Sequence, residues 1–173
     1  MNSIKQIEVL LADRLVGRLA LTKEGLCAFE YAPDWLGSGF SISPFELPLR
    51  SGVFIAKPRP FEGGFGVFDD CLPDGWGLLI LDRYLQQKGI NPRTLALLDR
   101  LALVGSTGRG ALEFRPDNSV VTRQDFADFE KLALEAEKIL ASDDYMGEGI
   151  EEFQARGGSP GGARPKIFVR YND

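Results

Sequence analysis

The segment from Gly157 to Lys166 contains the residue types needed to bind a polyphosphate. It reads Gly-Gly-Ser-Pro-Gly-Gly-Ala-Arg-Pro-Lys, and its four glycines allow backbone N–H groups to approach an anion without an intervening side chain. Ser159 adds a hydroxyl group, and Arg164 and Lys166 add positive charge. Together these features predict a phosphate-binding loop.

The spacing within this loop differs from that of two common nucleotide-binding motifs. It lacks the Gly-Lys-Ser/Thr ending of a Walker A loop, and it is not a G-x-G-x-x-G sequence between a strand and a helix. Residues Lys166–Tyr171 instead predict a strand after the loop. A loop followed by a strand is the arrangement with which kinases cover the phosphates of ATP. The alternative is a hairpin tip whose glycines provide only positive φ angles.

The residue types present limit other chemistry. The chain has no histidine, which excludes Ser-His-Asp and Cys-His catalysis, H-E-x-x-H metalloproteases, Cys/His zinc fingers and the usual H-R-D loop of protein kinases. Cys27 and Cys71 are too far apart for a C-x-x-C motif, so we expect two buried free thiols. Asp69, Asp70 and Asp74 could hold a metal, but their spacing around a proline favours a turn and helix capping, and we assign no metal site.

Length and composition indicate one globular domain, or one domain with a small appendage. The 173 residues are 44% hydrophobic and 26% charged, which argues against general disorder. A formal net charge of −5 argues against direct binding to nucleic acid. No apolar stretch approaches the roughly 18 residues of a membrane span, and charged residues interrupt the first 20 positions, so we expect no signal peptide. A soluble, cytoplasmic protein is therefore expected.

The chain is expected to begin with an antiparallel meander. Its strands are predicted by two apolar stretches, Ile4–Leu11 and Val16–Leu21, and by a third stretch, Leu26–Tyr31, in which apolar residues alternate. Pro33-Asp34 ends the alternation, and Trp35 and Leu36 are expected to pack back on the sheet. Residues 37–66 are rich in Gly, Ser and Pro and predict a long loop.

Two helices are expected after this loop. The first runs from an N-cap at Asp74 to Gly89, and it places Trp76 and Tyr84 in the core. Pro92 opens the second helix, which ends before Gly105. Its apolar residues are Leu95, Leu98, Leu101 and Ala102. Core packing is also expected for Phe54, Phe61, Phe65 and Phe68.

The remaining elements alternate between strand and helix. Ala111–Phe114 predicts a short strand after a glycine-containing turn. Thr122 with Asp125 is typical of a capping box, and an amphipathic helix extends from it to Ile139. The many acidic residues of this region are expected on a solvated helix face.

Six short motifs follow one another in an informative order. They are VGRL at 16–19, FEYAPDWL at 29–36, SISPFELPL at 41–49, FDDCLPDG at 68–75, VGSTGRGAL at 104–112 and GSPGGARPK at 158–166. In this order they resemble the amino-terminal part of HipA-family serine/threonine kinases, the toxins of type II toxin–antitoxin pairs. The resemblance extends through essentially the whole chain.

The resemblance implies an α+β fold with two parts. Residues 1–116 would form the HipA N-terminal subdomain, in which an antiparallel β-meander packs on helices. Residues 117–173 would contain the acidic helix, the glycine-rich loop and the first strands of an incomplete kinase-like N-lobe.

The resemblance also implies a role for the loop. The family's loop covers the phosphates of ATP, which it uses with Mg²⁺, and the matching positions are Gly158, Ser159, Gly161, Gly162, Ala163 and Lys166. Ser159 matches a serine whose autophosphorylation moves the loop away from the nucleotide and switches the kinase off, as expected when a phosphate adds nearly two negative charges. The family's targets are components of translation, including aminoacyl-tRNA synthetases, and its partner is the small DNA-binding antitoxin HipB.

The chain ends at Asp173, shortly after the strand expected beyond the loop. The strand lysine, the catalytic Asp, the Asn and the metal-binding Asp of a kinase cannot be assigned, so we expect no catalytic residue here. The leading hypothesis is a truncated amino-terminal portion of a HipA-like kinase, which alone binds ATP weakly at most and transfers no phosphate. The alternative is a stand-alone module that docks on a separately encoded kinase core. An unpaired strand edge and exposed apolar surface would also allow a homodimer.

Overall fold

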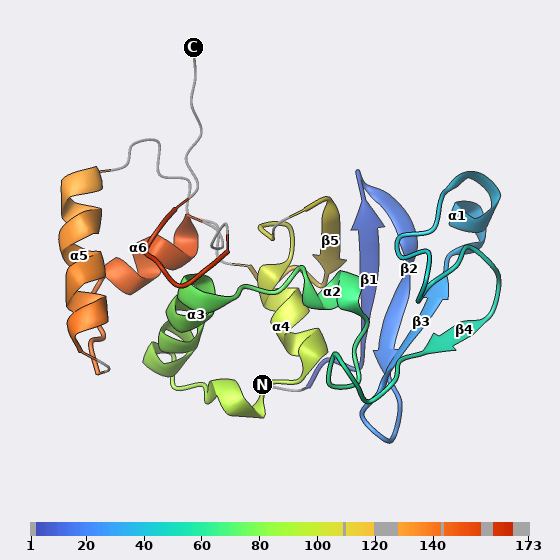
Figure 1. The fold of residues 1–173 in the computed structure, drawn as a ribbon, viewed down its shortest axis with the longest axis horizontal. Helices are drawn as coiled ribbons and strands as arrows, with labels where there is room; N and C mark the ends of the chain where they lie inside the picture. The colour runs from blue at the N-terminus through green and yellow to red at the C-terminus, as the bar shows by residue number, and fades with distance from the viewer. Residues whose placement is uncertain (1–2, 109, 120–127, 143, 157–160, 168–173) are drawn as a thin grey trace, which may run out of the picture. The chain divides into compact units, whose positions relative to one another are not determined.

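The computed structural model describes residues 3–108, 110–119, 128–142, 144–156 and 161–167 (Figure 1). The chain forms two compact units, residues 1–72 with 95–119 and residues 73–94 with 120–173. The first unit contains a five-stranded antiparallel sheet, and the described part of the second is helical. The predicted α+β fold class is therefore confirmed. The division predicted at residue 116, between a HipA subdomain and the start of a kinase lobe, stays a prediction.

The sheet has the strand order β4-β3-β2-β1-β5, with antiparallel neighbours throughout. The three strands of the predicted meander are β1 (Gln6–Leu11), β2 (Arg14–Leu21) and β3 (Cys27–Tyr31). The predicted short strand near residue 112 is β5 (Leu112–Arg115), which pairs with β1. The fourth strand, β4 (Val53–Ile55), lies inside the predicted loop. Three residues are too few for an alternation signal, and this strand forms by pairing with β3.

One face of the sheet carries a row of alternating charges. The register aligns Glu30 of β3 with Arg18 of β2, Arg18 with Glu8 of β1, and Glu8 with Arg115 of β5. The Arg18 and Glu8 side chains lie 3.3 Å apart and are both largely exposed. Opposite charges at directly paired positions stabilise a sheet modestly. This row therefore marks the solvated face, and the apolar side chains of the same strands point to the core.

Pro33 ends the meander by starting a helix, which the sequence reasoning did not predict. Helix α1 (Pro33–Ser38) has this proline in its first turn, where the missing N–H is tolerated. Trp35 is buried, its indole N–H donates to the Phe40 carbonyl at 2.9 Å, and the Arg14 guanidinium lies 4.9 Å from its ring centre. Leu36 packs against the same core. The prediction that both side chains return to the sheet is confirmed.

An aromatic cluster forms the centre of the first unit. Phe68 of α2 (Gly66–Asp69) is fully buried, with ring centres of Phe29, Phe65 and Phe114 at 5.5, 6.1 and 6.4 Å. Phe54 is also buried, as predicted, whereas Phe61 is only half-buried. The two cysteines, Cys27 and Cys71, are buried free thiols, and burial raises the pKa of Cys27 to about 11.

The helix predicted from Pro92 is wrong in its first half. Pro92–Thr94 forms a short 3-10 helix, and the α-helix α4 begins only at Leu97 and ends at Val104. The cause is Asp99, a buried carboxylate that accepts the Ala96 N–H at 3.0 Å and the Ile4 N–H at 2.9 Å. These contacts hold Ala96 as the N-cap, in an extended conformation. Leu98, Leu101 and Ala102 are buried as predicted, and Leu95 precedes the helix.

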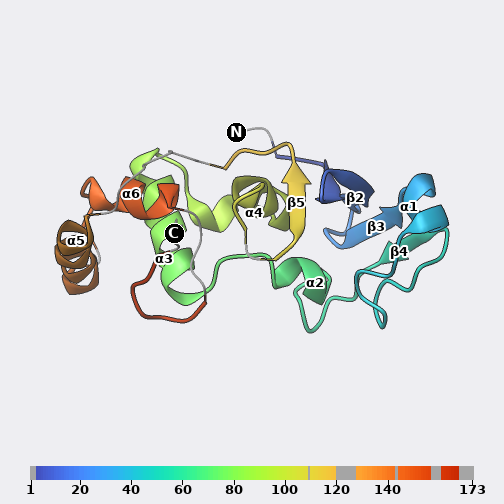
Figure 2. The same cartoon turned by 90° about the horizontal axis from the view of Figure 1, so that it is seen from above.

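Of the two helices expected next to the meander, the second, α4, belongs to the same unit as the sheet. Helix α4 contacts β1, β2 and β5, and Figure 2 shows it alongside β5. Helix α3 (Gly75–Gln87) belongs to the second unit, where it packs against α6 (Gly149–Ala155).

The second unit is built on α3, α5 (Phe129–Ala141) and α6, with α6 in contact with both other helices (Figures 1 and 2). The core prediction for Trp76 is confirmed, because it is buried with its ring centre 5.2 Å from that of Phe153, and Tyr84 packs at the edge of this cluster. Buried Arg83 donates to the Ile139 carbonyl at 2.6 Å, near the carboxyl end of α5. In the described residues, no helix has the length and apolar character needed to cross a membrane.

Helix α5 begins later than predicted. Asp128 is its N-cap, and the Asp128 side chain accepts the Lys131 N–H at 3.0 Å. The predicted capping box at Thr122 and Asp125 lies outside the described residues. The predicted strand over residues 166–171 also lies outside them, except for Lys166 and Ile167, which have no regular secondary structure.

Candidate functional site

The glycine-rich segment contains the residues predicted to bind nucleotide. Gly158 and Ser159 lie outside the described residues, whereas Gly161, Gly162, Ala163 and Lys166 are described in one continuous stretch of the second unit. Gly162 and Ala163 are exposed, and Gly161 and Lys166 are half-buried. This stretch, residues 161–167, is red in Figure 1 and is called the glycine segment below. Its nucleotide-binding role stays a prediction.

The backbone of the glycine segment requires glycine at two adjacent positions. Gly161 has a φ of 93° and Gly162 a φ of 89°, which are angles that other residues rarely adopt. Both the phosphate-binding interpretation and the hairpin-tip alternative expect such angles. The φ angles therefore do not distinguish these two interpretations, and the hydrogen-bond partners of the segment are needed to do so.

The glycine segment is hydrogen-bonded to the amino end of α3. The Gly162 N–H donates to Asp74 Oδ1 at 3.2 Å, and the Trp76 N–H donates to the Gly162 carbonyl at 2.9 Å. Gly75 lies between these two contacts and has a φ of 46°. A Cβ atom at Gly75 would lie 2.5 Å from the Gly162 carbonyl carbon and 2.9 Å from the Ala163 nitrogen. The close approach of the two segments therefore depends on glycine at position 75.

The role predicted for the Asp74 side chain is corrected by this contact. Asp74 occupies the N-cap position of α3, but its side chain makes no capping hydrogen bond to the helix. Instead its carboxylate accepts the Gly162 N–H. The N–H groups in the first turn of a helix have no acceptor within the helix, and that of Trp76 donates to the Gly162 carbonyl. Proximity between residues 74 and 162 cannot be read from sequence spacing. The Pro73-Asp74-Gly75 sequence was the only available signal of an unusual helix start.

Lys166 folds back on the same segment. Its ammonium group donates to the Gly161 carbonyl, and a Cβ atom at Gly162 would lie 3.2 Å from the Lys166 nitrogen. The Lys166 ammonium, the Gly162 N–H and the Asp74 carboxylate therefore all belong to the contact between the glycine segment and the amino end of α3. The donors suit a phosphate oxygen, but both already have acceptors within the protein.

An apolar pocket lies beside the glycine segment. It has a volume of about 340 Å³ and lies between α5, α6 and residues 165–167. Its lining residues are Phe129, Leu132, Ala133, Ala136, Glu137, Leu140, Phe153, Pro165, Lys166 and Ile167. Sequence reasoning did not predict this pocket, because its walls come from segments distant in the chain.

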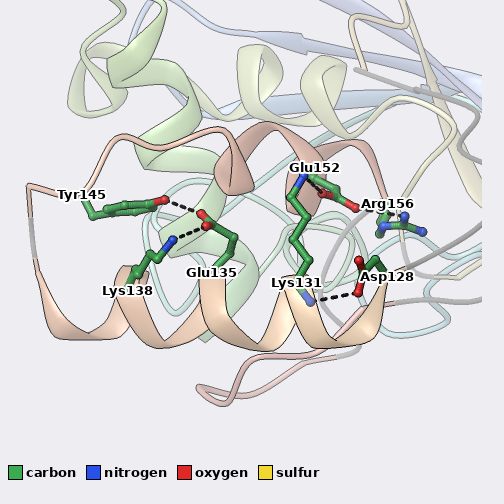
Figure 3. Close-up of polar contacts among 7 residues, drawn as sticks. All are labelled: Asp128, Lys131, Glu135, Lys138, Tyr145, Glu152 and Arg156. Carbon is green, nitrogen blue, oxygen red and sulfur yellow. Dashed lines mark hydrogen bonds and ion pairs between the residues drawn. The ribbon is translucent and has the colours of Figure 1, made fainter.

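The acidic helix is not solvated along its whole polar side, as Figure 3 shows. Glu135 of α5 is buried, lies 2.7 Å from the Lys138 ammonium and accepts a hydrogen bond from the Tyr145 hydroxyl. The Lys138 contact, followed by that of Tyr145, lowers the pKa of Glu135, and the same carboxylate raises the pKa values of both partners. Farther along, Glu152 of α6 binds Arg156 at 3.1 Å and lies 3.9 Å from the Lys131 ammonium. Of these contacts, the Lys131–Glu152 pair connects α5 with α6, and the Tyr145 hydrogen bond connects α5 with the segment that follows it.

The acidic residues near Pro73 do not assemble into a metal site within the described residues, where no group of three or more His, Cys, Asp or Glu side chains could hold a metal ion. Asp74 contacts the glycine segment, as described above. Burial, followed by repulsion from Asp70 and Glu62, raises the pKa of Asp69.

Two comparisons with known proteins bear on this arrangement. The family model described as HipA N-terminal domain matches residues 7–115. A solved structure of HipA from Shewanella oneidensis MR-1, in a complex with HipB and its operator DNA, is similar to this chain with a TM-score of 0.49 and 20% sequence identity. The similarity covers 82% of this chain and 30% of that HipA chain.

Proposed function

This chain belongs to the HipA N-terminal domain family, and on that premise we propose that it is the N-terminal portion of a HipA-like serine/threonine protein kinase toxin of a type II toxin–antitoxin system. The proposal includes a nucleotide-binding role for six residues of the loop: Gly158, Ser159, Gly161, Gly162, Ala163 and Lys166. Matched family residues end at 115, so this role rests on the chemistry of the glycine segment.

The observation that carries the nucleotide role is the pairing of exposed glycine backbone with a lysine ammonium. Gly162 has a positive φ, its N–H donates to the anionic Asp74 carboxylate, and the Lys166 ammonium lies beside it. Backbone N–H groups and an ammonium are the donors with which proteins bind phosphate. ATP, bound with Mg²⁺, would supply the phosphoryl group, and this chain would supply donors to its phosphates. No residue of the chain is assigned a catalytic role.

Isothermal titration of the 173-residue chain with Mg-ATP tests this function. We expect weak binding without phosphate transfer, and about tenfold weaker binding for Lys166→Ala, the change expected when a charged hydrogen bond to phosphate is lost. Lys23→Ala is the matched control, because Lys23 is an exposed lysine of the first unit. Equal affinity in wild type and Lys166→Ala would contradict the proposed site, and robust phosphorylation by the pure chain would contradict its assignment as non-catalytic.

The regulatory part of the proposal concerns Ser159. A phosphate at this position would place nearly two negative charges beside the triphosphate that the loop must accept. Substitution Ser159→Asp, which adds one negative charge, is expected to weaken Mg-ATP binding at least about tenfold, whereas Ser159→Ala leaves it within about twofold. Equal affinity for Mg-ATP in the two variants would contradict a regulatory role for this serine.

The second candidate function is a module that docks on a separately encoded HipA-like kinase core. It is favoured by exposed apolar side chains on β4, an edge strand of the sheet, and in the connection that precedes this strand: Val53 and Ile55 on β4, and Phe40 and Phe45 before it. Phe45 is 99% exposed, which is rare for a large apolar residue without a partner. Co-expression with a kinase core, and separately with a HipB-like antitoxin, tests both partners. Retention of either protein by wild type, and its loss with Phe45→Ser, would support docking.

A further inference from the structure

We propose that the Asp74 carboxylate is an internal competitor for the anionic ligand of the glycine segment, and that this segment must leave the amino end of α3 before it can bind a nucleotide phosphate. The inference rests on the proposed nucleotide role. It assigns to Asp74 and Gly75 a regulatory function within that site.

The first argument is chemical equivalence between Asp74 and a phosphate. The Gly162 N–H donates to Asp74 Oδ1 at 3.2 Å. A carboxylate oxygen and a phosphate oxygen are both anionic acceptors that backbone N–H groups bind strongly. One N–H cannot serve both acceptors at full strength. Asp74 therefore takes the place that a phosphate oxygen would occupy.

The second argument is that the residues on both sides of Gly75, Asp74 and Trp76, are hydrogen-bonded to Gly162. The Trp76 N–H donates to the Gly162 carbonyl at 2.9 Å, on the other side of Gly75 from the Asp74 contact. Helix N-termini carry N–H groups that need an external acceptor, and the Gly162 carbonyl supplies one. Release of the segment therefore breaks two hydrogen bonds together. The segment docked on α3 is therefore a defined state, distinct from the released state that would bind a nucleotide.

The third argument is that the segment's cation is also engaged. The Lys166 ammonium donates to the Gly161 carbonyl, so it points back at the segment's own backbone. An ammonium group has three N–H donors, so this bond directs the Lys166 side chain toward its own segment and leaves donors that a phosphate could also use. When the segment is docked on α3, the single donor of the Gly162 N–H is therefore occupied and the Lys166 ammonium is partly engaged.

This arrangement lowers the apparent affinity for nucleotide. When only a fraction of the molecules has a released segment, the apparent dissociation constant equals the intrinsic constant divided by that fraction. Removing a charge-assisted hydrogen bond shifts such an equilibrium by about tenfold or more. Weakening the Asp74 contact is therefore expected to tighten binding of Mg-ATP, the opposite of what loss of a ligand-binding residue would do.

Two variants weaken the contact in different ways. Asp74→Ala removes the acceptor, and Gly75→Ala places a Cβ atom 2.5 Å from the Gly162 carbonyl. Gly75→Ala also strains a backbone with a φ of 46°, so its matched control is Gly89→Ala, where φ is 72° and nothing lies within 4 Å of the added Cβ. The control for lost charge is Glu130→Gln, at an exposed position of α5.

Two measurements on the 173-residue chain test the proposal. Amide exchange of Gly162, followed by NMR, is expected to be about tenfold faster in Asp74→Ala and Gly75→Ala than in wild type. Titration with Mg-ATP is expected to give about tenfold tighter binding in the same two variants, with both controls within about twofold of wild type. Far-UV circular dichroism identifies any variant that has lost its helices. Asp74→Asn then replaces Asp74→Ala; it keeps an acceptor oxygen but removes its charge, so smaller changes in the same directions are expected.

The outcomes separate this inference from the function on which it rests. Unchanged Gly162 exchange in the Asp74 variants would overturn the contact itself. Mg-ATP binding that is equally tight in wild type and Asp74→Ala would overturn competition by Asp74 but leave the nucleotide role intact. Absence of Mg-ATP binding in every variant, with Gly162 exchange accelerated as expected, would overturn both the competition and the proposed nucleotide role.

Discussion

The phenolic oxygen of Tyr31 lies 2.6 Å from the carbonyl oxygen of Leu47, to which it donates a hydrogen bond, and it accepts the Ile42 N–H at 3.1 Å. Tyr31 is buried at the end of β3, and both partners belong to the segment 41–49. One side chain therefore joins the meander to the long connection that follows it. This explains how a segment rich in serine and proline lies ordered against the sheet.

Substitution of Tyr31 by Phe is expected to destabilise the protein by about 1–2 kcal/mol, because the backbone N–H of half-buried Ile42 loses its acceptor. The Leu47 carbonyl keeps the Ser41 hydroxyl as a donor at 2.8 Å, which limits the loss. Urea unfolding of the variant and of wild type measures the difference. Tyr84→Phe, at a half-buried tyrosine of the second unit, is the control, and equal losses in the two variants would contradict the role of Tyr31.

Gly17, in the first family-like motif, is expected to tolerate no side chain. A Cβ atom there would lie 2.3 Å from the Glu30 carbonyl oxygen and 2.7 Å from the Phe29 ring, so Gly17→Ala is expected to lower the free energy of unfolding by about 1–3 kcal/mol. Gly37→Ala in α1 meets nothing within 4 Å and is expected to be neutral or to stabilise by up to about 1 kcal/mol. Thermal melts of both variants compare them. A stable Gly17→Ala protein would show that β2 and β3 can separate at this point without loss.

Two phenylalanines are expected to respond very differently to the same substitution. Phe68 is fully buried among three other aromatic rings, and Phe68→Ala is expected to destabilise by about 3–5 kcal/mol. Phe45 is 99% exposed, and Phe45→Ala is expected to change stability by less than about 0.5 kcal/mol. Chemical unfolding of the isolated chain gives both values. A large loss for Phe45→Ala would mean that this side chain is covered in solution.

The Glu135 contacts are expected to make stability depend on pH. Lys138 and Tyr145 hold the pKa of Glu135 below its ordinary value of 4.5. A lowered folded-state pKa contributes stability that is fully present above pH 4.5 and is lost as the pH falls through the lowered value. Wild type should therefore have a higher melting temperature than Glu135→Gln at pH 7, and the two should converge in acid.

The control for this pH dependence is Glu137→Gln, because Glu137 is an exposed carboxylate on the same helix. Its melting temperature is expected to follow that of wild type from pH 7 to acid. A constant difference between Glu135→Gln and wild type at all pH values would mean that the carboxylate charge is not what stabilises the contact.

Local patterns predicted much of the first unit. Apolar stretches separated by a turn located β1 and β2, and alternation with period two located β3, because each strand buries one face against the core. The ordered motifs indicated the family, which the match over residues 7–115 confirms. The short strand β4 and the helix start at Leu97 were missed, because both depend on distant partners, a neighbouring strand and the N–H of Ile4.

By itself, the sequence determined the meander, the buried aromatic residues, the family and the glycine-rich segment with its positive charges. These features are encoded in side-chain periodicity and in residue types that act locally. Only the tertiary structure decided that α3 groups with α6, that Glu135 is buried, and that Asp74 binds Gly162 rather than its own helix. The physical reason is distance along the chain: Asp74 and Gly162 are 88 residues apart, and no local preference of either residue specifies the other as its partner.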